Sequence, residues 1–203
     1  MSITIEYFHS LSSPWAYLGA QRLYAIAERH RATVVPRPIL VLQENGGIPL
    51  RTRPDARQAY HAVELDRWRR YLDLPLKLKP RYYPTQPYES CLLVIAARQL
   101  GLDANGLSFR LLEALWANER DTLDPAVRHA VALETGLDAD AVVAHAASDA
   151  VREEWDRNRD DALRLGIFGT PNYVLDGEIF WGQDRLEFLD RRLQERRRID
   201  FGA

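Results

Sequence analysis

Three short stretches of the chain carry side chains that could act on a bound molecule. The first contains Ser13 and Pro14, directly after an apolar segment. This pair is typical of a helix N-terminus, where the serine hydroxyl accepts a backbone amide and proline takes the first helical position. The same place offers free amides and the positive end of the helix dipole to an anion, including a thiolate. Ser13 is therefore either a simple cap or the partner of a bound anion.

The second stretch is Thr170-Pro171, which leads into an apolar run. Proline is tolerated at the start of a strand, at an edge or in a turn, so an ordinary loop is one interpretation. The other is a cis peptide bond, the minority state for X-Pro. It would turn the backbone N–H and C=O of Thr170 outward, where they could pair with an extended ligand.

The third stretch, Gly182 to Arg185, precedes the last predicted helix. Asp184 here is typical of a helix cap, with Arg185 exposed to solvent. The alternative is that Asp184 binds an α-ammonium group while Arg185 or backbone amides bind a carboxylate. A ligand with an amino-acid head group requires that pattern.

Several other chemistries have no support in the sequence. The single cysteine, Cys91, excludes an intramolecular disulfide, a two-cysteine redox motif and a metal site built on several thiolates. The five histidines show no paired metal-ligand spacing, and no metal is expected. There is no nucleophile elbow, phosphate loop or dinucleotide fingerprint.

The composition indicates one globular domain, alone or with a large insertion. The chain has 203 residues, of which 46% are hydrophobic and 28% charged, with a net charge of −2. That balance supports neither a nucleic-acid nor a membrane partner. Without a signal peptide pattern or an apolar run long enough for a bilayer, we expect a cytoplasmic protein.

Secondary-structure patterns place the three stretches at the ends of predicted elements. Alternation predicts a strand over residues 3–8, helical spacing a helix over 14–30, and β-branched residues a second strand over 33–41. Near the C-terminus, Asp176-Gly177 predicts a hairpin, which a helix starting at Asp184 follows.

Between these units, roughly 120 residues are predicted to be almost entirely helical. Asp124 caps one of the helices, and the last helical stretch runs from near Asp138 to Gly166. We therefore predict an α/β protein with a thioredoxin-like fold, in which β-α-β and β-β-α units form a four-stranded sheet around a large all-α insertion. Residues 1–42 and 167–203 would form the thioredoxin-like domain, and 43–166 the helical insertion.

The three stretches, taken together, resemble those of a known family. The matching segments are "SSPWAYLGAQRL", "RPILVLQENGGIP" and "GIFGTPNYVLDGEIFWGQDRL", with the helical insertion between them. They are similar to the DsbA-like thioredoxin-fold family and, within it, to the 2-hydroxychromene-2-carboxylate isomerases and kappa-class glutathione transferases. The resemblance extends over nearly the whole chain.

In that family a serine replaces the first cysteine of the redox motif, and here Ser13 and Ala16 occupy the two cysteine positions. Disulfide exchange needs a thiolate that this site does not supply. The resemblance implies that the thiolate belongs to glutathione as cofactor, hydrogen-bonded to Ser13.

The resemblance also implies the other contacts to glutathione. Thr170, before a cis Pro171, would pair with the cysteinyl backbone, and Asp184 with Arg185 would hold the γ-glutamyl end. Arg57 corresponds to a basic position that contributes to glutathione binding in relatives. A solvent-exposed helix face is the alternative for Arg57.

For the substrate, a small aromatic compound, the resemblance suggests a pocket near Trp15 and Tyr17. Core packing is the alternative for such aromatic residues. Relatives commonly carry an asparagine where this chain has Gly47, and Asn45 would substitute from two residues away.

The function implied is a glutathione-dependent isomerase that interconverts 2-hydroxychromene-2-carboxylate, or an analogue, and trans-o-hydroxybenzylidenepyruvate. The alternatives are a kappa-like glutathione transferase or peroxidase, and a non-catalytic module that binds thiols or extended peptides. A homodimer is expected because relatives are dimeric.

Overall fold

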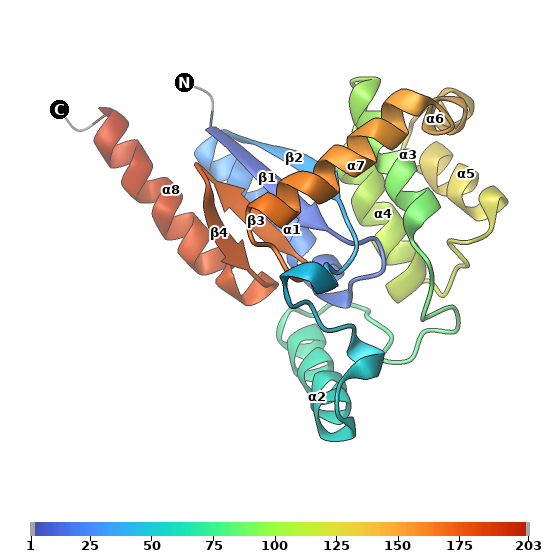
Figure 1. The fold of residues 1–203 in the computed structure, drawn as a ribbon, viewed down its shortest axis with the longest axis horizontal. Helices are drawn as coiled ribbons and strands as arrows, with labels where there is room; N and C mark the ends of the chain where they lie inside the picture. The colour runs from blue at the N-terminus through green and yellow to red at the C-terminus, as the bar shows by residue number, and fades with distance from the viewer. Residues whose placement is uncertain (1–2, 202–203) are drawn as a thin grey trace.

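A four-stranded mixed sheet forms the centre of the computed structural model, which describes residues 3–201 (Figure 1). The strand order is β2-β1-β3-β4, with β1 parallel to β2 and antiparallel to β3. This confirms the predicted fold class. Residues 1–2 and 202–203 of the predicted domain lie outside the described residues. The strands are β1 (Ile3–His9), β2 (Ala32–Pro38), β3 (Asn172–Leu175) and β4 (Glu178–Trp181).

Helices cover both faces of this sheet. Helix α1 (Pro14–His30) and helix α8 (Leu186–Phe201) share one apolar core with the face that presents Tyr173. The opposite face, which presents Val174, packs against α7 (Asp149–Arg164). Neighbouring residues of a strand point to opposite faces, so one short strand serves both cores.

The C-terminal hairpin forms as predicted. Asp176 and Gly177 both have positive φ, 53° and 85°, and they join β3 to β4. Two-residue hairpin turns favour this conformation because its twist matches that of the strands. The predicted cap of the following helix is wrong. Asp184 lies inside a short 3-10 helix, η3 (Gln183–Arg185), and α8 begins only at Leu186.

The insertion between β2 and β3 is helical, as predicted. Asp124 caps α5 by accepting the amide of Ala126. The single helix predicted from near Asp138 is in fact two helices, because the Ser148 side chain accepts the amide of Val151 and starts a new helix. In addition to α7, the helices are α2 (Asp55–Tyr71), α3 (Tyr88–Gln99), α4 (Ala104–Trp116), α5 (Pro125–Glu134) and α6 (Ala139–Ala146).

Helix α2 lies apart from the other helices of the insertion, below the sheet in Figure 1 and near α1. The chain reaches it through two further 3-10 turns, η1 (Gln43–Asn45) and η2 (Leu50–Thr52). Within residues 3–201, no helix is both long and apolar enough to cross a membrane.

Candidate functional site

A cavity of about 660 Å³ brings the three sequence stretches together. It opens between the start of α1, the loop after β2, one face of α2, and the segments that flank the hairpin. Ser13, Thr170 and Asp184 all line it, although more than 150 residues separate the first from the other two. A concave site with convergent polar groups is where a ligand is expected to bind.

Ser13 is both a cap and a wall of this cavity. Its Oγ accepts the amide hydrogen of Ala16 at 3.2 Å, and Pro14 fills the first helical position. A hydroxyl has one donor in addition to its acceptor lone pairs, so Ser13 can still donate to an anion. The two interpretations of Ser13 are therefore compatible.

The segment before β3 has the geometry implied for it. The Thr170–Pro171 peptide bond is cis, as expected from the resemblance, and Thr170 lines the cavity. Within the described part of the chain, neither backbone polar group of Thr170 has a backbone hydrogen-bond partner. Pro171 lies buried beside the cavity, and its carbonyl accepts the amide of Gly182 at 2.9 Å. Thr170 therefore offers a free backbone N–H and C=O at the cavity that Ser13 also lines.

Asp184 and Arg185 form an ion pair at the cavity wall, with 2.7 Å between Oδ2 and Nη1. Both side chains are about half exposed, 44% and 50%, so a ligand can reach them. Gly182 has a φ of +95°, and a Cβ there would lie 2.5 Å from Asp184 Oδ1. Glycine is therefore required for this turn. Gln183 is buried and accepts from Arg22 of α1 at 2.7 Å, which ties the turn to α1.

Helix α2 supplies a polar wall that the sequence analysis largely missed. Arg57 is exposed and lines the cavity, and its guanidinium forms no hydrogen bond or ion pair with another residue that the structure describes. Arg53 also lines the cavity, and its guanidinium donates to the Ile48 carbonyl at 2.9 Å. The spacing of Arg57, His61 and Glu64 could have indicated this wall, because it puts three polar residues on one face of the helix.

Aromatic rings surround the same space. Trp15 lines it, as predicted, at the start of α1. Phe168 and Trp181 form an edge-to-face pair with 4.6 Å between their centroids, and Trp181 is 50% exposed. Tyr60, Trp68 and Tyr83 also line the cavity. The cavity therefore offers both apolar aromatic surface and charged groups.

Two predicted pocket residues do not line the cavity. Tyr17 is buried and stacks on Phe109 of the helical insertion, with centroids 5.8 Å apart. This burial raises the pKa of its hydroxyl to about 12. The side chain of Asn45 instead donates to the carbonyls of Leu163 and Ile167, at 3.0 and 2.9 Å. Asn45 therefore fastens the loop after β2 to the end of α7.

Gly47 lines the cavity and leaves no room for a larger residue. A Cβ there would collide with the carbonyl oxygen of Phe168 and lie 2.5 Å from that of Leu42. The asparagine that relatives carry in this loop therefore cannot be placed at position 47 without moving backbone. The amide of Gly47 donates to the Leu42 carbonyl at 2.9 Å, which closes the loop.

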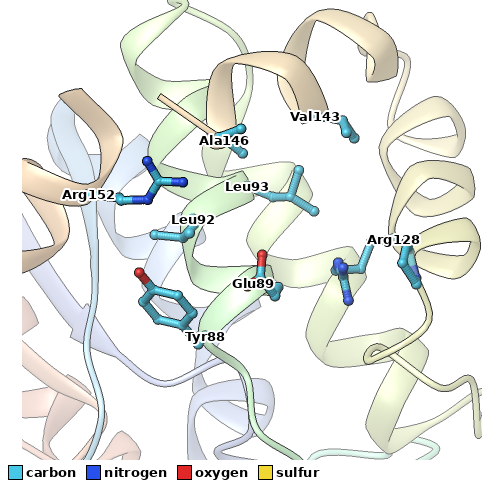
Figure 2. A pocket seen from close by; sticks show the side chains of 10 residues that line it. Tyr88, Glu89, Leu92, Leu93, Arg128, Val143, Ala146 and Arg152 are labelled. Atoms are coloured by element: carbon cyan, nitrogen blue, oxygen red, sulfur yellow. The ribbon is translucent and has the colours of Figure 1, made fainter. Parts of the chain in front are cut away.

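A second, smaller cavity of about 300 Å³ lies in the helical insertion, and Figure 2 shows side chains of α3, α5 and α6 around it. Its Arg128 already donates to the carbonyls of Thr122 and Leu123, at 2.9 and 2.7 Å. None of the predicted site residues is there. Among the side chains of residues 3–196 no three metal-ligating groups gather.

The sheet, the cis Pro171 and Ser13 at the start of α1 define a protein of the thioredoxin-fold class without its redox cysteines. The chain belongs to the DsbA-like thioredoxin family, since the family profile described as DSBA-like thioredoxin domain matches residues 4–194.

Individual relatives agree with this assignment. The chain is 27% identical to a 2-hydroxychromene-2-carboxylate isomerase of Sphingobium xenophagum, over 95% of this chain and 99% of that protein. It is 24% identical to the human glutathione S-transferase kappa 1, over 95% and 92% of the two chains. A solved structure titled 2-hydroxychromene-2-carboxylate isomerase superposes with a TM-score of 0.82 at 23% identity, over 97% of both chains, and so shares the fold.

Proposed function

We propose that the protein is a glutathione-dependent isomerase that interconverts 2-hydroxychromene-2-carboxylate, or a close analogue, and trans-o-hydroxybenzylidenepyruvate. The observation that carries the proposal is the convergence of Ser13, Thr170 and the Asp184–Arg185 pair on one cavity. The isomerase and transferase names of the relatives support it at the level of the family.

The residues of the cavity fit glutathione as a cofactor. The free backbone groups of Thr170 suit the cysteinyl residue of an extended tripeptide. Asp184 and Arg185 suit the ammonium and carboxylate of the γ-glutamyl end. Arg57 supplies positive charge on the opposite wall for a further carboxylate.

Glutathione, when bound, supplies a thiolate that can add reversibly to a conjugated carbonyl compound. The task of Ser13 is to donate its hydroxyl hydrogen to that sulfur, at the positive end of the α1 dipole. Both effects stabilise the ionised form and lower the pKa of the thiol. The chain itself offers no such thiolate, because burial raises the pKa of Cys91 to about 12.

The remaining walls suit an aromatic acceptor. Trp15, Phe168 and Trp181 offer ring faces to a flat substrate. Arg53 is half-buried, whereas Arg57 is exposed, and the Arg53 guanidinium is available to a substrate carboxylate. The isomerisation changes no oxidation state, so a site without redox cysteines is sufficient for it.

The second candidate is a kappa-like glutathione transferase, which the similarity to glutathione S-transferase kappa 1 favours. The glutathione site would be the same, and the two activities differ in the product. A transferase accumulates a glutathione conjugate, whereas an isomerase returns glutathione unchanged.

Glutathione binding provides the test of the site. Millimolar glutathione should raise the melting temperature, because a ligand that binds only the folded state stabilises it. Asp184→Asn should weaken glutathione binding by about tenfold, the loss expected for one charge-assisted hydrogen bond. Isothermal titration calorimetry measures this directly.

The matched control is Glu187→Gln, which removes a carboxylate one turn later that pairs with Arg191 on the surface. It should leave glutathione binding unchanged. Equal affinities of Asp184→Asn and the unmodified protein would contradict the γ-glutamyl assignment. The absence of any thermal shift with glutathione would contradict the proposed function itself.

A further inference from the structure

The start of α1 and helix α2 are joined by a hydrogen bond inside the cavity. The indole Nε1–H of Trp15 donates to Nε2 of His61 over 3.0 Å. The two rings stand nearly perpendicular, at 88°, with 5.3 Å between their centroids. Both residues line the cavity that also contains Ser13. The ring of His61 is therefore held in a defined orientation at the cavity wall.

This hydrogen bond determines where the hydrogen of His61 sits. An indole N–H can only donate, so Nε2 of His61 must be the unprotonated nitrogen. In a neutral imidazole the other nitrogen, Nδ1, then carries the hydrogen. Among the side chains described, those of residues 3–196, Nδ1 of His61 has no hydrogen-bond partner, and it is not fully buried. His61 therefore has a free N–H donor on a ring that lines the cavity.

The surroundings keep the ring neutral. Burial, and secondly the charge of Arg53, lower the pKa of His61 below its usual value. The other charged or titratable groups that line the cavity are Tyr60, Arg57 and Glu64 of α2, Tyr83, and the Asp184–Arg185 pair. The neutral form is also the form that the Trp15 hydrogen bond requires.

A purely structural role would use only half of this arrangement. A structural hydrogen bond between α1 and α2 needs Nε2 of His61 and the indole of Trp15, but it does not need an unpartnered Nδ1–H on a ring that lines the cavity. A polar group that water can reach is hydrogen-bonded to water until a ligand displaces that water. Beside Arg53, the ligand group with the right chemistry is an oxygen that accepts hydrogen bonds and carries or gains negative charge.

We propose that His61 donates its Nδ1–H to the carbonyl or carboxylate oxygen of the α-keto acid substrate, and that Trp15 is the positioning residue that fixes its tautomer. This inference rests on the proposed function. A preorganised neutral donor stabilises negative charge that builds up on such an oxygen during reaction, without a change in its own protonation. His61 would thus act on the substrate.

Two substitutions test the roles of the two ring nitrogens of His61 separately. His61→Gln places an amide oxygen near the position of Nε2, so it can still accept from Trp15 but loses the Nδ1 donor. His61→Asn places an amide NH₂ near the position of Nδ1, so it keeps the donor and loses the acceptor. His129→Gln, on the surface of α5, is the control for a histidine outside the cavity.

The probe is trans-benzylidenepyruvate, which lacks the hydroxyl group needed for ring closure, titrated in the absence of glutathione. His61→Gln should bind it about tenfold more weakly than the unmodified protein, and His61→Asn about twofold more weakly. His129→Gln should bind it with unchanged affinity. Glutathione affinity should stay the same in all three variants.

The tautomer is measured independently by long-range proton–nitrogen correlation spectra of the histidine rings. The unmodified protein should show His61 with its hydrogen on Nδ1. Trp15→Phe removes the donor that disfavours protonation of Nε2, so the pKa of His61 should rise and both tautomers should appear. If the Trp15–His61 hydrogen bond only joined the two helices, Trp15→Phe would not change the tautomer of His61 and also weaken substrate binding.

Equal probe affinities of His61→Gln and the unmodified protein would overturn the inference, as would a hydrogen found on Nε2. So would a failure of the unmodified protein to bind the probe. Failure of the proposed function gives a different pattern, in which the unmodified protein neither binds glutathione nor converts the chromene.

Discussion

Ser13 has two hydrogen-bonding tasks at the start of α1. Its Oγ accepts the Ala16 amide, and its hydroxyl hydrogen remains free to donate into the cavity. Where a redox thioredoxin carries cysteines, this site carries Ser13 and Ala16. The helix N-terminus that would stabilise a protein thiolate is therefore available to the thiolate of a ligand.

Removal of this hydroxyl should affect bound glutathione more than the fold. In Ser13→Ala the thiol of bound glutathione should titrate at a higher pH, seen as weaker thiolate absorbance in the ultraviolet at neutral pH. The free energy of unfolding should fall by about 1 kcal/mol for the lost cap. Ser148→Ala, which removes the cap of α7, should cost similar stability and leave the thiol unchanged. If Ser13→Ala leaves the titration unchanged, Ser13 is only a cap.

At the scale of residues, the sequence predicted those that belong to local motifs. Ser13, Thr170 and Asp184 each lie at the end of an element, and end positions carry recognisable residue types. His61 and Arg53 were missed because their place depends on where α2 packs, which is a tertiary property. Tyr17 was predicted as a pocket residue from its closeness to Ser13, but contact with the helical insertion buries it.

At the scale of elements, the loop after β2 shapes one wall of the cavity through Gly47. Gly47→Ala should lower the free energy of unfolding by about 1–3 kcal/mol, because the added carbon meets backbone oxygens on two sides. The neighbouring Gly46→Asn is the control. Gly46 has a φ of +83° and no atom within 4 Å of an added Cβ, and asparagine tolerates that conformation.

Chemical denaturation measures both variants of this loop. In Gly47→Ala the added carbon would push the loop away from the backbone at Phe168. Both segments line the cavity, so the variant should also bind glutathione more weakly. A Gly47→Ala variant as stable as Gly46→Asn would show that the loop is free to move, contrary to this account.

His9 connects the end of β1 to helix α4. Its Nδ1–H donates to the Tyr7 carbonyl at 3.0 Å, and its Nε2 accepts from the Ser108 hydroxyl at 2.6 Å. The ring is fully buried, and burial lowers its pKa to about 4. The folded protein therefore holds this imidazole neutral while the unfolded chain protonates it at its ordinary pKa.

This difference makes stability depend on pH. Below the ordinary pKa of histidine the unfolded state binds one more proton than the folded state, so acid favours unfolding. When the pH falls from about 7 to about 5, protonation of His9 in the unfolded state should lower the free energy of unfolding by about 2 kcal/mol. Urea titrations at both values of pH measure it. His9→Gln, which does not titrate, should show a smaller loss, and an equal loss would refute the assignment.

Element boundaries were predicted well wherever a cap or a turn marked them. Helix α1 has the predicted range, and the Asp176-Gly177 turn is in place. The helix from Asp138 was predicted too long because the internal cap at Ser148 was overlooked. Asp184 was predicted as a cap because its residue type fits, but the positive φ of Gly182 directs the chain into a 3-10 turn first.

At the scale of the whole molecule, the site depends on the insertion. The chain leaves the sheet after β2, forms α2 beside the start of α1, and returns to pair β3 with β1 (Figure 1). The loop after β2, helix α2 and Tyr83 therefore belong to the insertion, whereas the start of α1 and the turn after β4 belong to the sheet and its helices. The division at residues 42 and 167, the homodimer and the cytoplasmic location stay predictions.

The most direct test of the central claim is to incubate the protein with 2-hydroxychromene-2-carboxylate, with and without glutathione, and to follow the absorbance of the ring-opened product. We expect conversion to trans-o-hydroxybenzylidenepyruvate only when glutathione is present, with the glutathione concentration unchanged at equilibrium. Accumulation of a glutathione conjugate would identify a transferase instead. No conversion at saturating glutathione would contradict the proposed function.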